Sequence, residues 1–395
     1  MILKKFKLAN FRNYPELELS FNAKFNYIYG DNGHGKTNIL EAISLLTFGK
    51  SFIGSGEIDC VMFGEQEFFV TGEFENEIDN TDLVVLNYNG EARKKVYHLN
   101  RDPVRSFSSD LFGRIPVVFL SPHSLNITYG NPGERRKFFD IIISQTGTIY
   151  LDNLKKLVKL VKLKNALLKA GSRYAPSEKD DLLNSYNEKL ADVGSEIIFR
   201  RLIFLKEFKS FFEKNFRYLT AEDNYCSIIY YSDVIGEIKY DEIDEYTPGE
   251  IKEKIEAVLI ERRKEEIDRG LTLVGPQRDD FLFKLEKDKS ENTGEVFDLK
   301  NHASQGEHKT FVVALILAEF DFLKEKRDTA PLLLLDDILS ELDSGRVFKI
   351  ISHLKEFGQI FLTTTGEDYL KKIEEMYGED EIEVFKVVRG NVTEQ

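Results

Sequence analysis

Eight consecutive residues, Gly30 to Thr37, combine the residue types that bind phosphate groups. They read GDNGHGKT and fit the phosphate-loop pattern G-x-x-x-x-G-K-[ST], with Gly30, Gly35, Lys36 and Thr37 at the defining positions. Glycines allow the tight bend in which successive backbone N–H groups point at phosphate oxygens. The lysine supplies a positive charge for the β- and γ-phosphates, and the threonine hydroxyl is a ligand for Mg²⁺. The pattern therefore predicts a site for a nucleoside triphosphate.

The residues on both sides of this loop support the match. Phe25 to Tyr29 form a β-prone run before it, and Asn38 to Phe48 follow with apolar residues at helical spacing, closed by Gly49. A strand, a loop and a helix in this order place phosphates at a helix N-terminus, which a chance match in a glycine-rich turn does not explain. The residues that we expect to contact the nucleotide here are Gly30, Asp31, Asn32, Gly33, His34, Gly35, Lys36, Thr37 and Asn38.

Two acidic residues follow a second apolar run. Residues 331–335 read PLLLL, which is typical of a buried strand, and Asp336 and Asp337 come directly after it. A phosphate-loop ATPase needs a carboxylate at the end of a strand beside the loop to position Mg²⁺, and Asp336 fits this role together with Thr37. Asp337 is the candidate to activate or orient the attacking water, with Lys36 as a second catalytic group. The alternative is a strand that ends in two solvated acids.

A third candidate segment, SQGEHKT at residues 304–310, precedes an apolar helix. Ser304 with Glu307 three residues later is a capping box, so the segment is at least a well-formed helix start. Such a helix N-terminus is also an anion site, and Gly306 allows close approach. Because the phosphate loop already occupies one face of the triphosphate, we expect Ser304 and Gly306 to cover the γ-phosphate held by a second subunit.

Composition restricts the class of protein. The chain has 395 residues, enough for more than one domain, and no apolar run approaches the length of a membrane span. Cys60 and Cys226 are far apart and lack neighbours at metal-ligand spacing, which favours a cytoplasmic protein over a disulfide or zinc scaffold. A net charge of −14 does not exclude nucleic acid, because screening limits surface charges to about 8 Å and a local basic patch decides binding.

Patterns along the chain predict an α/β fold interrupted by helices. An Asn89-Gly90 pair between two β-prone runs predicts a tight hairpin with positive φ at both central positions. The predicted strands are 2–9, 17–21, 25–29, 68–74, 83–88, 93–100, 117–120, 226–231, 271–274, 281–285, 332–335 and 360–363. The predicted helices are 38–48, 151–170, 181–218, 249–270, 311–324 and 346–357. These segments indicate one nucleotide-binding domain with a mixed sheet and an antiparallel β subdomain, split in sequence by a helical second lobe.

The order of the motifs resembles that of ABC-type ATPase heads. Phosphate loop, Ser-x-Gly signature, an apolar strand with two acids, and then residues 340–343 (SELD) follow one another as in those heads. Over its full length the chain resembles the RecF family of bacterial DNA replication and repair ATPases. The resemblance implies an ATP-binding lobe from residues 1–120 and 271–395 and a helical lobe at 121–270. The further segments that carry it are Asn10–Tyr14, Gly49–Phe52, Phe119–Pro122, Gly133–Asp140 and Thr272–Asp280.

The resemblance also implies a function. A member of the family would bind ATP and Mg²⁺, dimerise head to tail around two nucleotides, and load onto DNA at gaps and single-strand–double-strand junctions. It would act with RecO and RecR to help RecA assemble, and slow hydrolysis would release it. Asp343 joins Ser304 and Gly306 as an implied nucleotide contact. Thr364 lies where many ABC heads have a switch histidine, so a threonine hydroxyl would contact the γ-phosphate side.

Some residues depart from the common patterns. Asp337 stands where most ABC heads have Glu, a difference that the RecF family shares and that fits slow turnover. Lys309 replaces a frequent Arg in the signature, and Gln277 replaces a frequent His. Ile53 and Gly54 take the place of an expected Arg. We find no clear glutamine for the loop that links the lobes.

Basic side chains are candidates for DNA phosphate contacts, although each one alone is more often part of a solvated face. No aromatic or recognition-helix pattern indicates sequence-specific base reading. The candidates are Arg12, Lys50, Arg93, Lys94, Lys95, Arg101, Arg105, Arg135, Arg136, Lys137 and, on one helix, Lys155, Lys156, Lys159, Lys162, Lys164 and Lys169.

Three other classes of protein share parts of this pattern. An SMC-like head expects a long heptad array, for which the helical insertion is too short. A transporter nucleotide-binding subunit leaves the segments 133–140 and 275–280 unexplained. A non-enzymatic scaffold would bind ATP without hydrolysing it.

Overall fold

The computed structural model divides into two compact units. The first contains Met1–Leu125 and Lys309–Gln395, and the second contains Asn126–His308. Residues 271–308 thus fall in the second unit rather than with the ATP-binding lobe, because the strand at 280–286 pairs with the strand at 225–232. The residues that the structure describes are 1–21, 24–76, 80–170, 175–220, 225–286, 296–338, 349–353 and 358–395.

The first unit begins with an antiparallel sheet. In spatial order its strands are β2 (Tyr14–Ser20), β1 (Ile2–Phe11), β4 (Glu67–Glu75), β5 (Thr81–Asn89), β6 (Lys94–Leu99) and β7 (Asp102–Pro103). The predicted pairing of the first two strands is confirmed, with Phe6 opposite Leu19. Buried and half-buried side chains alternate along β4, as expected for a sheet with one face on the core.

The hairpin of β5 and β6 is confirmed, but its predicted tight turn is wrong. Asn89 pairs with Lys94, so four residues connect the strands instead of two. The backbone N–H of Gly90 donates to the carbonyl of Gln66 at 2.7 Å, which holds Gly90 in line with the neighbouring strand. The positive φ of the connection falls on Arg93, at 49°. The turn is therefore held both by Gln66, which is distant in sequence, and by the local hydrogen bond from Ala92 N to Asn89 Oδ1 at 2.8 Å.

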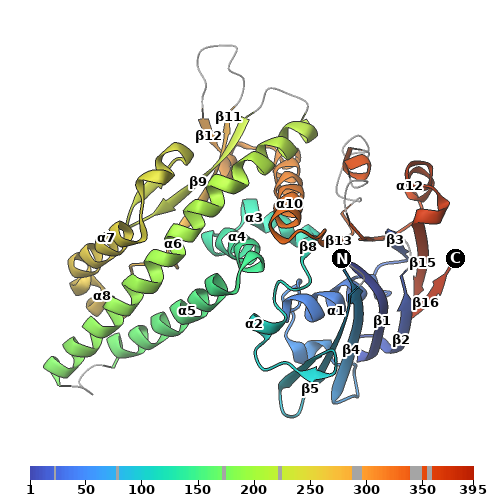
Figure 1. The fold of residues 1–395 in the computed structure, drawn as a ribbon, viewed down its shortest axis with the longest axis horizontal. Helices are drawn as coiled ribbons and strands as arrows, with labels where there is room; N and C mark the ends of the chain where they lie inside the picture. The colour runs from blue at the N-terminus through green and yellow to red at the C-terminus, as the bar shows by residue number, and fades with distance from the viewer. Residues whose placement is uncertain are drawn as a thin grey trace. The chain divides into compact units, whose positions relative to one another are not determined.

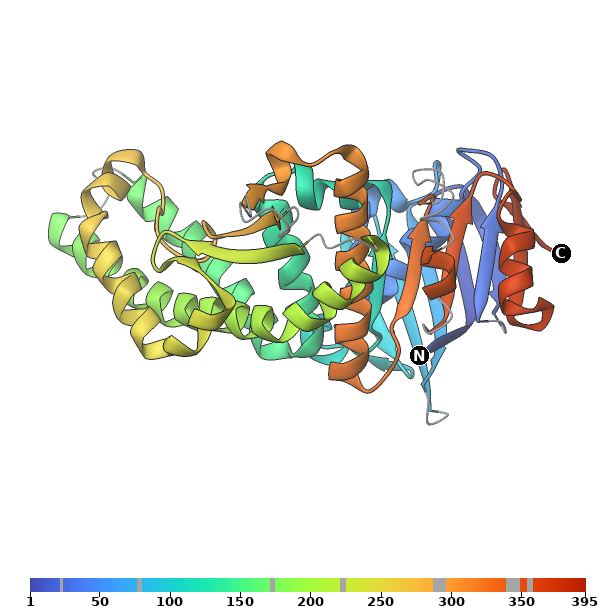
Figure 2. The same ribbon diagram turned by 90° about the horizontal axis from the view of Figure 1, so that it is seen from above.

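A second sheet in the first unit is mostly parallel. In spatial order its strands are β16 (Asn391–Glu394), β15 (Ile382–Val388), β3 (Phe25–Tyr29), β14 (Ile360–Thr364), β13 (Leu332–Asp336) and β8 (Val117–Leu120). Only β16 runs antiparallel to its neighbour. Every residue of β3, β13 and β14 is buried, which explains their near-continuous apolar runs. Figure 2 shows these strands from distant parts of the chain side by side.

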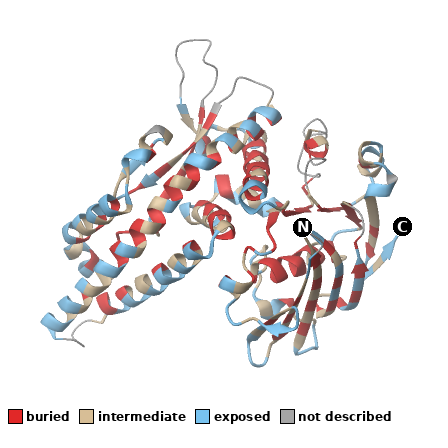
Figure 3. Cartoon of the chain, in the orientation of Figure 1, coloured by how far each residue is buried: buried red, intermediate tan, exposed pale blue. Residues whose placement is uncertain are grey.

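Helix α1 (Lys36–Phe48) packs between the two sheets. It contacts β4 and β5 on one side and β13 and β14 on the other, so one core joins all three layers (Figure 3). The predicted end of the helix is confirmed, because Gly49 is left-handed with φ 71° and its N–H donates to the carbonyl of Leu45. The other elements of this unit are η1 (Glu57–Cys60), α2 (Phe107–Asp110), η2 (Pro122–Leu125), α12 (Leu370–Tyr377) and η7 (Glu379–Glu381).

The second unit combines long helices with a small antiparallel sheet. In spatial order the strands are β10 (Gly236–Ile238), β9 (Tyr225–Ser232), β11 (Asp280–Glu286) and β12 (Val296–Asp298). The shorter helices are α3 (Asn126–Tyr129), α4 (Pro132–Thr146), η4 (Tyr240–Glu245), α8 (Arg263–Arg269) and α9 (Leu299–His302). The longer ones are α5 (Thr148–Leu168), α6 (Pro176–Thr220), α7 (Pro248–Glu261) and α10 (Gln305–Arg327), the last of which continues into the first unit. Helices α5 and α7 both pack against α6, so the predicted helical hairpin of α5 and α6 is confirmed (Figure 1).

Two predicted elements of the second unit differ in the structure. The expected helix at 249–270 is interrupted at Arg262, where α8 begins. Residues 271–274 form no strand, because side chains satisfy their backbone: Thr272 N donates to Asn165 Oδ1 at 2.6 Å and Leu273 N donates to Glu266 Oε1 at 2.8 Å. Most of the helix expected at 346–357 lies outside the described residues, and residues 349–353 are helical. Among the helices that the structure describes, none is long and apolar enough to cross a membrane.

Candidate nucleotide-binding site

The phosphate loop has the backbone shape that its glycines predict. Gly35 has φ 113°, and a Cβ on it would lie 2.6 Å from Nδ2 of Asn13. Gly30 has φ 153°, and a Cβ there would lie 2.2 Å from the carbonyl oxygen of Val387. Left-handed backbone and close neighbours together restrict both positions to glycine. The loop therefore bends as the pattern requires and leads directly into α1 at Lys36.

Two turns from distant parts of the chain hold the loop from outside. Between β1 and β2, Asn13 Nδ2 donates to the carbonyl of His34 at 2.9 Å, and the Tyr14 hydroxyl donates to the carbonyl of Gly35 at 3.0 Å. Between β15 and β16, the N–H of Gly390 donates to the same His34 carbonyl at 3.0 Å. Asn38 Nδ2 donates to Asn13 Oδ1 at 2.8 Å, which links the start of α1 to the same turn. Sequence patterns did not predict these supports, although Asn13 and Tyr14 belong to the segment 10–14 that carries the family resemblance.

Lys36 lies inside the loop it belongs to. Its ammonium donates to the carbonyls of Gly30 at 2.7 Å and Asp31 at 3.0 Å. An ammonium has three N–H donors, so one remains for a phosphate oxygen. Burial lowers the pKa of Lys36, and the charges of Asp337 and Asp336 oppose that shift. Lys36 therefore stays a candidate for binding a phosphate group, with its ammonium held at the loop.

Asp336 forms hydrogen bonds with both the residue at the end of the phosphate loop and a residue of β14. Its Oδ1 accepts hydrogen bonds from the hydroxyl of Thr37 at 2.9 Å and from the hydroxyl of Thr363 at 2.7 Å. Burial raises the pKa of Asp336, while these two hydroxyls lower it and Asp337 raises it further. Mg²⁺ in sites of this kind uses one or two protein oxygens together with substrate phosphates. The Thr37 and Asp336 oxygens fit that incomplete ligand set, and the described residues hold no cluster of three or more His, Cys, Asp or Glu that could bind a metal alone.

Asp337 follows with an unusual backbone. Its φ is 48°, and its N–H donates to both the carbonyl and the hydroxyl of Thr363, at 3.2 Å and 3.1 Å. This double contact turns the chain at the end of β13 and fixes the base of the Asp337 side chain. Thr364 is also buried at this edge, where its carbonyl accepts from the N–H of Gly30 at 3.3 Å. Loop, acids and threonines therefore meet at the same ends of β3, β13 and β14.

The signature segment lies in the second unit. Its predicted capping box is present, because Ser304 N donates to Glu307 Oε2 at 2.7 Å and Glu307 N donates to Ser304 Oγ at 3.3 Å. Ser304 is exposed and Gly306 is half-buried at the start of α10. One turn further, the His308 ring stacks on Tyr129 with centroids 3.9 Å apart. Asp343, the remaining predicted contact, lies outside the described residues.

Comparison with known proteins identifies the family. The model of the RecF/RecN/SMC N terminal domain matches residues 2–384. The "DNA replication and repair protein RecF" of Bacteroides fragilis (strain ATCC 25285) is 34% identical and covers 100% of this chain and 98% of its own. The protein of the same name from Salinibacter ruber is 34% identical over 92% of this chain and 85% of its own.

The chain belongs to the RecF family.

Solved structures agree with this assignment. The recombination mediator protein RecF-ATPrS in the RecFOR pathway matches with a TM-score of 0.85 and 30% identity, and covers 100% of this chain and 98% of its own. The corresponding RecF-ATP structure has a TM-score of 0.84 at 30% identity and covers 100% of this chain and 99% of its own. A Pyrococcus furiosus Smc head domain shares the fold, with a TM-score of 0.54 at 15% identity over 100% of this chain and 96% of its own. The predicted ABC-type ATPase head fold is therefore confirmed.

In this RecF-family chain several basic candidates for DNA contact have partners inside the protein. Arg12 donates through Nε and Nη2 to both oxygens of Glu41, each at 2.8 Å, and also to Ser55 and the carbonyl of Asp59. Glu41 is fully buried, so Arg12 neutralises a core carboxylate. Lys164, on the lysine-rich helix, is 1% exposed and paired with buried Glu266 at 2.6 Å. Lys95, Arg135 and Arg136 are also engaged, by Glu57, Asp280 and the carbonyl of Asp279.

The remaining basic candidates are exposed. They are Lys50, Arg93, Lys94, Arg101, Arg105, Lys137, Lys155, Lys156, Lys159, Lys162 and Lys169. Sequence patterns could not separate the two groups, because the internal partners Glu41 and Glu266 are distant in sequence from Arg12 and Lys164.

Lys36→Met should abolish ATP binding, because it removes the cation inside the loop while preserving the apolar stem. Isothermal titration with ATP and Mg²⁺ measures this, and Lys50→Met is the control, since Lys50 is exposed just beyond α1. An ATP affinity in Lys36→Met equal to that of the control would contradict the loop assignment.

Arg12→Ala should lower the free energy of unfolding by about 3–5 kcal/mol, because it leaves the charge of Glu41 buried without its main partner. Denaturant unfolding followed by circular dichroism measures the loss. The matched change Arg105→Ala, at an exposed arginine of the same unit, should stay within about 0.5 kcal/mol of the unchanged protein. If Arg12→Ala unfolds like the control, the pair of Arg12 with Glu41 does not stabilise the first unit.

Proposed function

We propose that this RecF-family chain is an ATP-gated DNA-binding protein of recombinational repair and replication. It binds ATP with Mg²⁺, closes into a head-to-tail homodimer on DNA, and hydrolyses ATP weakly to open again. It works in the cytoplasm at gaps and single-strand–double-strand junctions, with RecO and RecR, and helps RecA to load. The observation that carries the proposal is the bond from Thr37 to Asp336 beside a braced phosphate loop, in a chain similar to the RecF-ATP structure.

The contacts of the site support a role for each residue. Lys36 has one N–H left for a γ-phosphate oxygen, and the backbone N–H groups of Gly33, Gly35 and Thr37 face the phosphates. Thr37 and Asp336 hold Mg²⁺, which when bound neutralises charge on the β- and γ-phosphate oxygens. Asp337 orients and deprotonates the attacking water from a backbone fixed by Thr363. Thr364 places a hydroxyl on the γ-phosphate side.

The signature residues Ser304 and Gly306 belong to a different unit from the phosphate loop, and the proposal gives them a role in a dimer. Ser304 and Gly306 begin a long helix whose N-terminal end carries a partial positive charge, and Ser304 is exposed. In the proposed dimer Ser304 and Gly306 contact the γ-phosphate bound by the other subunit. ATP is then shared by two chains, so its presence sets the affinity of one chain for the other. Hydrolysis removes the shared phosphate and releases the dimer.

DNA binding in this proposal uses exposed basic residues outside α5, such as Lys50, Arg93 and Arg101. The chain as a whole is acidic, so the contacts are local and act through phosphates instead of base edges. Each phosphate contact adds about 0.9 to the slope of log affinity against log salt for duplex DNA. A few phosphate contacts on one face of each of the two subunits are therefore enough for measurable affinity for DNA.

The direct test is binding to duplex, single-stranded and junction DNA, with and without ATP, across a salt series. We expect measurable affinity for duplex and junction only with ATP, with a slope against salt that reports several phosphate contacts. Fluorescence anisotropy of labelled DNA gives both quantities. Equal DNA binding with and without ATP, or no DNA binding in either case, would contradict the proposal that ATP controls DNA binding.

Ser304→Arg should leave ATP binding intact and prevent ATP-induced dimerisation, because it adds bulk at the place where the partner's phosphate is expected. Sedimentation velocity with ATP measures the dimer. Thr247→Arg is a matched control, since Thr247 and Glu250 form the same kind of capping box at α7. A normal dimer of Ser304→Arg, or equal loss in both variants, would contradict the role across the subunit interface.

Asp337→Asn should lower the single-turnover hydrolysis rate by about 100-fold or more while the ATP-bound dimer persists, because the amide cannot accept the proton of water. Asp328→Asn is the control: Asp328 is exposed and has the same φ of 48°. Undiminished turnover in Asp337→Asn would remove Asp337 from the catalytic group.

A further inference from the structure

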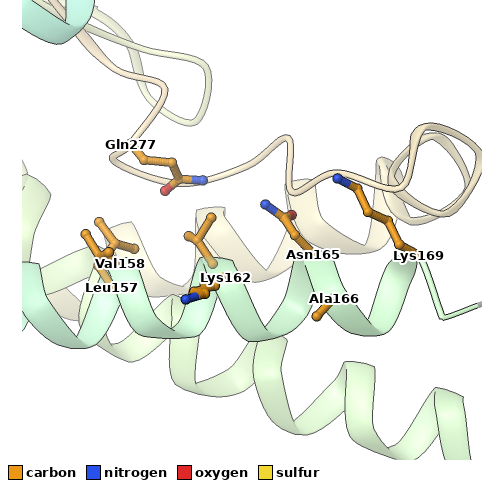
Figure 4. A pocket seen from close by; sticks show the side chains of 8 residues that line it. Leu157, Val158, Lys162, Asn165, Ala166, Lys169 and Gln277 are labelled. Carbon is orange, nitrogen blue, oxygen red and sulfur yellow. The ribbon is translucent and has the colours of Figure 1, made fainter.

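A hollow lies on the surface of the second unit along helix α5. Its volume is about 520 Å³, and one wall is a face of α5 that includes Leu157, Val158 and Ala166. The opposite side is formed by Gln277, on the segment that precedes β11 (Figure 4). Almost all of the surface inside it is apolar. It belongs neither to the phosphate loop nor to the signature segment.

Part of the apolar wall of the hollow is exposed to solvent. Val158 is 69% exposed, whereas Leu157, which also lines the hollow, is 3% exposed. The residues of α5 that line the hollow extend from Leu157 to Lys169, so the hollow is about 18 Å long along the helix axis. An extended peptide of about five or six residues spans that length. Apolar surface arranged as a groove of this size is typical of a place where another chain binds.

Two of the residues that line the groove, Lys162 and Lys169, are cations, and Lys155 and Lys159 lie nearby in the sequence of α5. Lys155, Lys159, Lys162 and Lys169 are exposed, and no described acidic residue forms an ion pair with them. Some other cations of the same unit do have ion-pair partners: Lys206 pairs with Asp244, Lys252 with Asp192 and Arg263 with Asp180. In a chain with a net charge of −14, four lysines on one helix without an ion pair to any described acid are a local excess of positive charge.

The two polar side chains of the groove are held in place. Asn165 Oδ1 accepts from both the N–H and the hydroxyl of Thr272, at 2.6 Å and 2.8 Å, which leaves the amide donors of Asn165 for a ligand. Gln277 Nε2 donates to the carbonyl of Val274 at 2.8 Å, so this side chain is fixed at the other side of the groove. The amide donors of Asn165 suit the carbonyl groups of a peptide backbone.

We propose that this groove binds an acidic peptide segment of a partner protein, anchored by one bulky apolar side chain. The apolar side chain fills the hollow over Val158 and Ala166, while Asp and Glu residues on either side meet the lysines. DNA phosphates would use the lysines alone and would leave the exposed apolar wall in water, so the hollow favours a peptide over a nucleic acid. The site requires neither ATP nor a second copy of the chain.

The probes are fluorescein-labelled peptides of about ten residues, enough to overhang the groove at both ends. One has acidic residues on both sides of a central Phe, a second replaces that Phe with Gly, and a third replaces the acids with their amides. Anisotropy with the full-length chain measures affinity, and a labelled DNA duplex is measured in parallel. We expect the first peptide to bind, with each of the other two weaker by about tenfold and with affinity falling as salt rises.

Variants of the chain separate the two contributions. Val158→Ser should weaken the Phe peptide about tenfold and leave duplex affinity unchanged, because it removes only apolar contact. Ile260→Ser, at a residue of α7 that is 76% exposed, is the matched control and should change neither. The double change Lys159→Glu with Lys162→Glu should abolish peptide binding.

Three results would overturn the proposal. One is equal affinity for the Phe and Gly peptides, and another is no effect of Val158→Ser beyond that of Ile260→Ser. The third combines two observations: the unchanged chain binds none of the peptides, and the lysine double variant loses affinity for duplex DNA. That result would assign this face of α5 to DNA phosphates instead.

Discussion

One carboxylate oxygen, Oδ1 of Asp336, accepts hydrogen bonds from two hydroxyls that come from opposite ends of the sequence. The arrangement depends on the register of three parallel strands. Asp336 in β13 lies opposite Thr363 in β14, and Thr364 lies opposite Tyr29 in β3, so Gly30 and the phosphate loop follow at the same edge. A shift by one residue between β13 and β14 would move Thr363 away from Asp336, and a shift between β14 and β3 would move the phosphate loop and Thr37 away from it. Strand register, more than any single contact, therefore sets the site.

The antiparallel sheet contributes by fixing the outside of the loop. Asn13 and Tyr14 hold its carbonyls through the turn of the first hairpin, and Gly390 does so through the last one. Carbonyls bound on the outer side leave the loop N–H groups to face inward, as an anion site requires. Arg12, in the same turn as Asn13, is anchored to Glu41 of α1, so the turn and the helix that follows the loop are connected. The candidate site thus rests on both sheets of its unit.

Sequence patterns predicted correctly the elements that depend on residues close together in the chain. Strand β13, helix α1 and the capping box at Ser304 arise from apolar runs, helical spacing and short-range polar pairs, and all are present. The failures involve partners distant in sequence. The turn after Asn89 is held partly by Gln66, and Thr272 bonds to Asn165 in place of a neighbouring strand. Arg12 and Lys164 point into the core toward acids that no spacing rule connects to them. Charge alone does not reveal whether a basic residue is solvated or buried.

The central position of β3 has a consequence for synthesis of the chain. This strand, near the N-terminus, pairs only with β14 and β15, more than 300 residues later, since their registers join Phe25 to Ile360 and to Ile382. The second unit, by contrast, is one continuous segment, Asn126–His308. On a ribosome, where domains fold as they emerge, the helical unit can fold while β3 still waits for its neighbours. The nucleotide-binding sheet is then among the last parts of the protein to form, and an incomplete nascent chain has no assembled site for ATP.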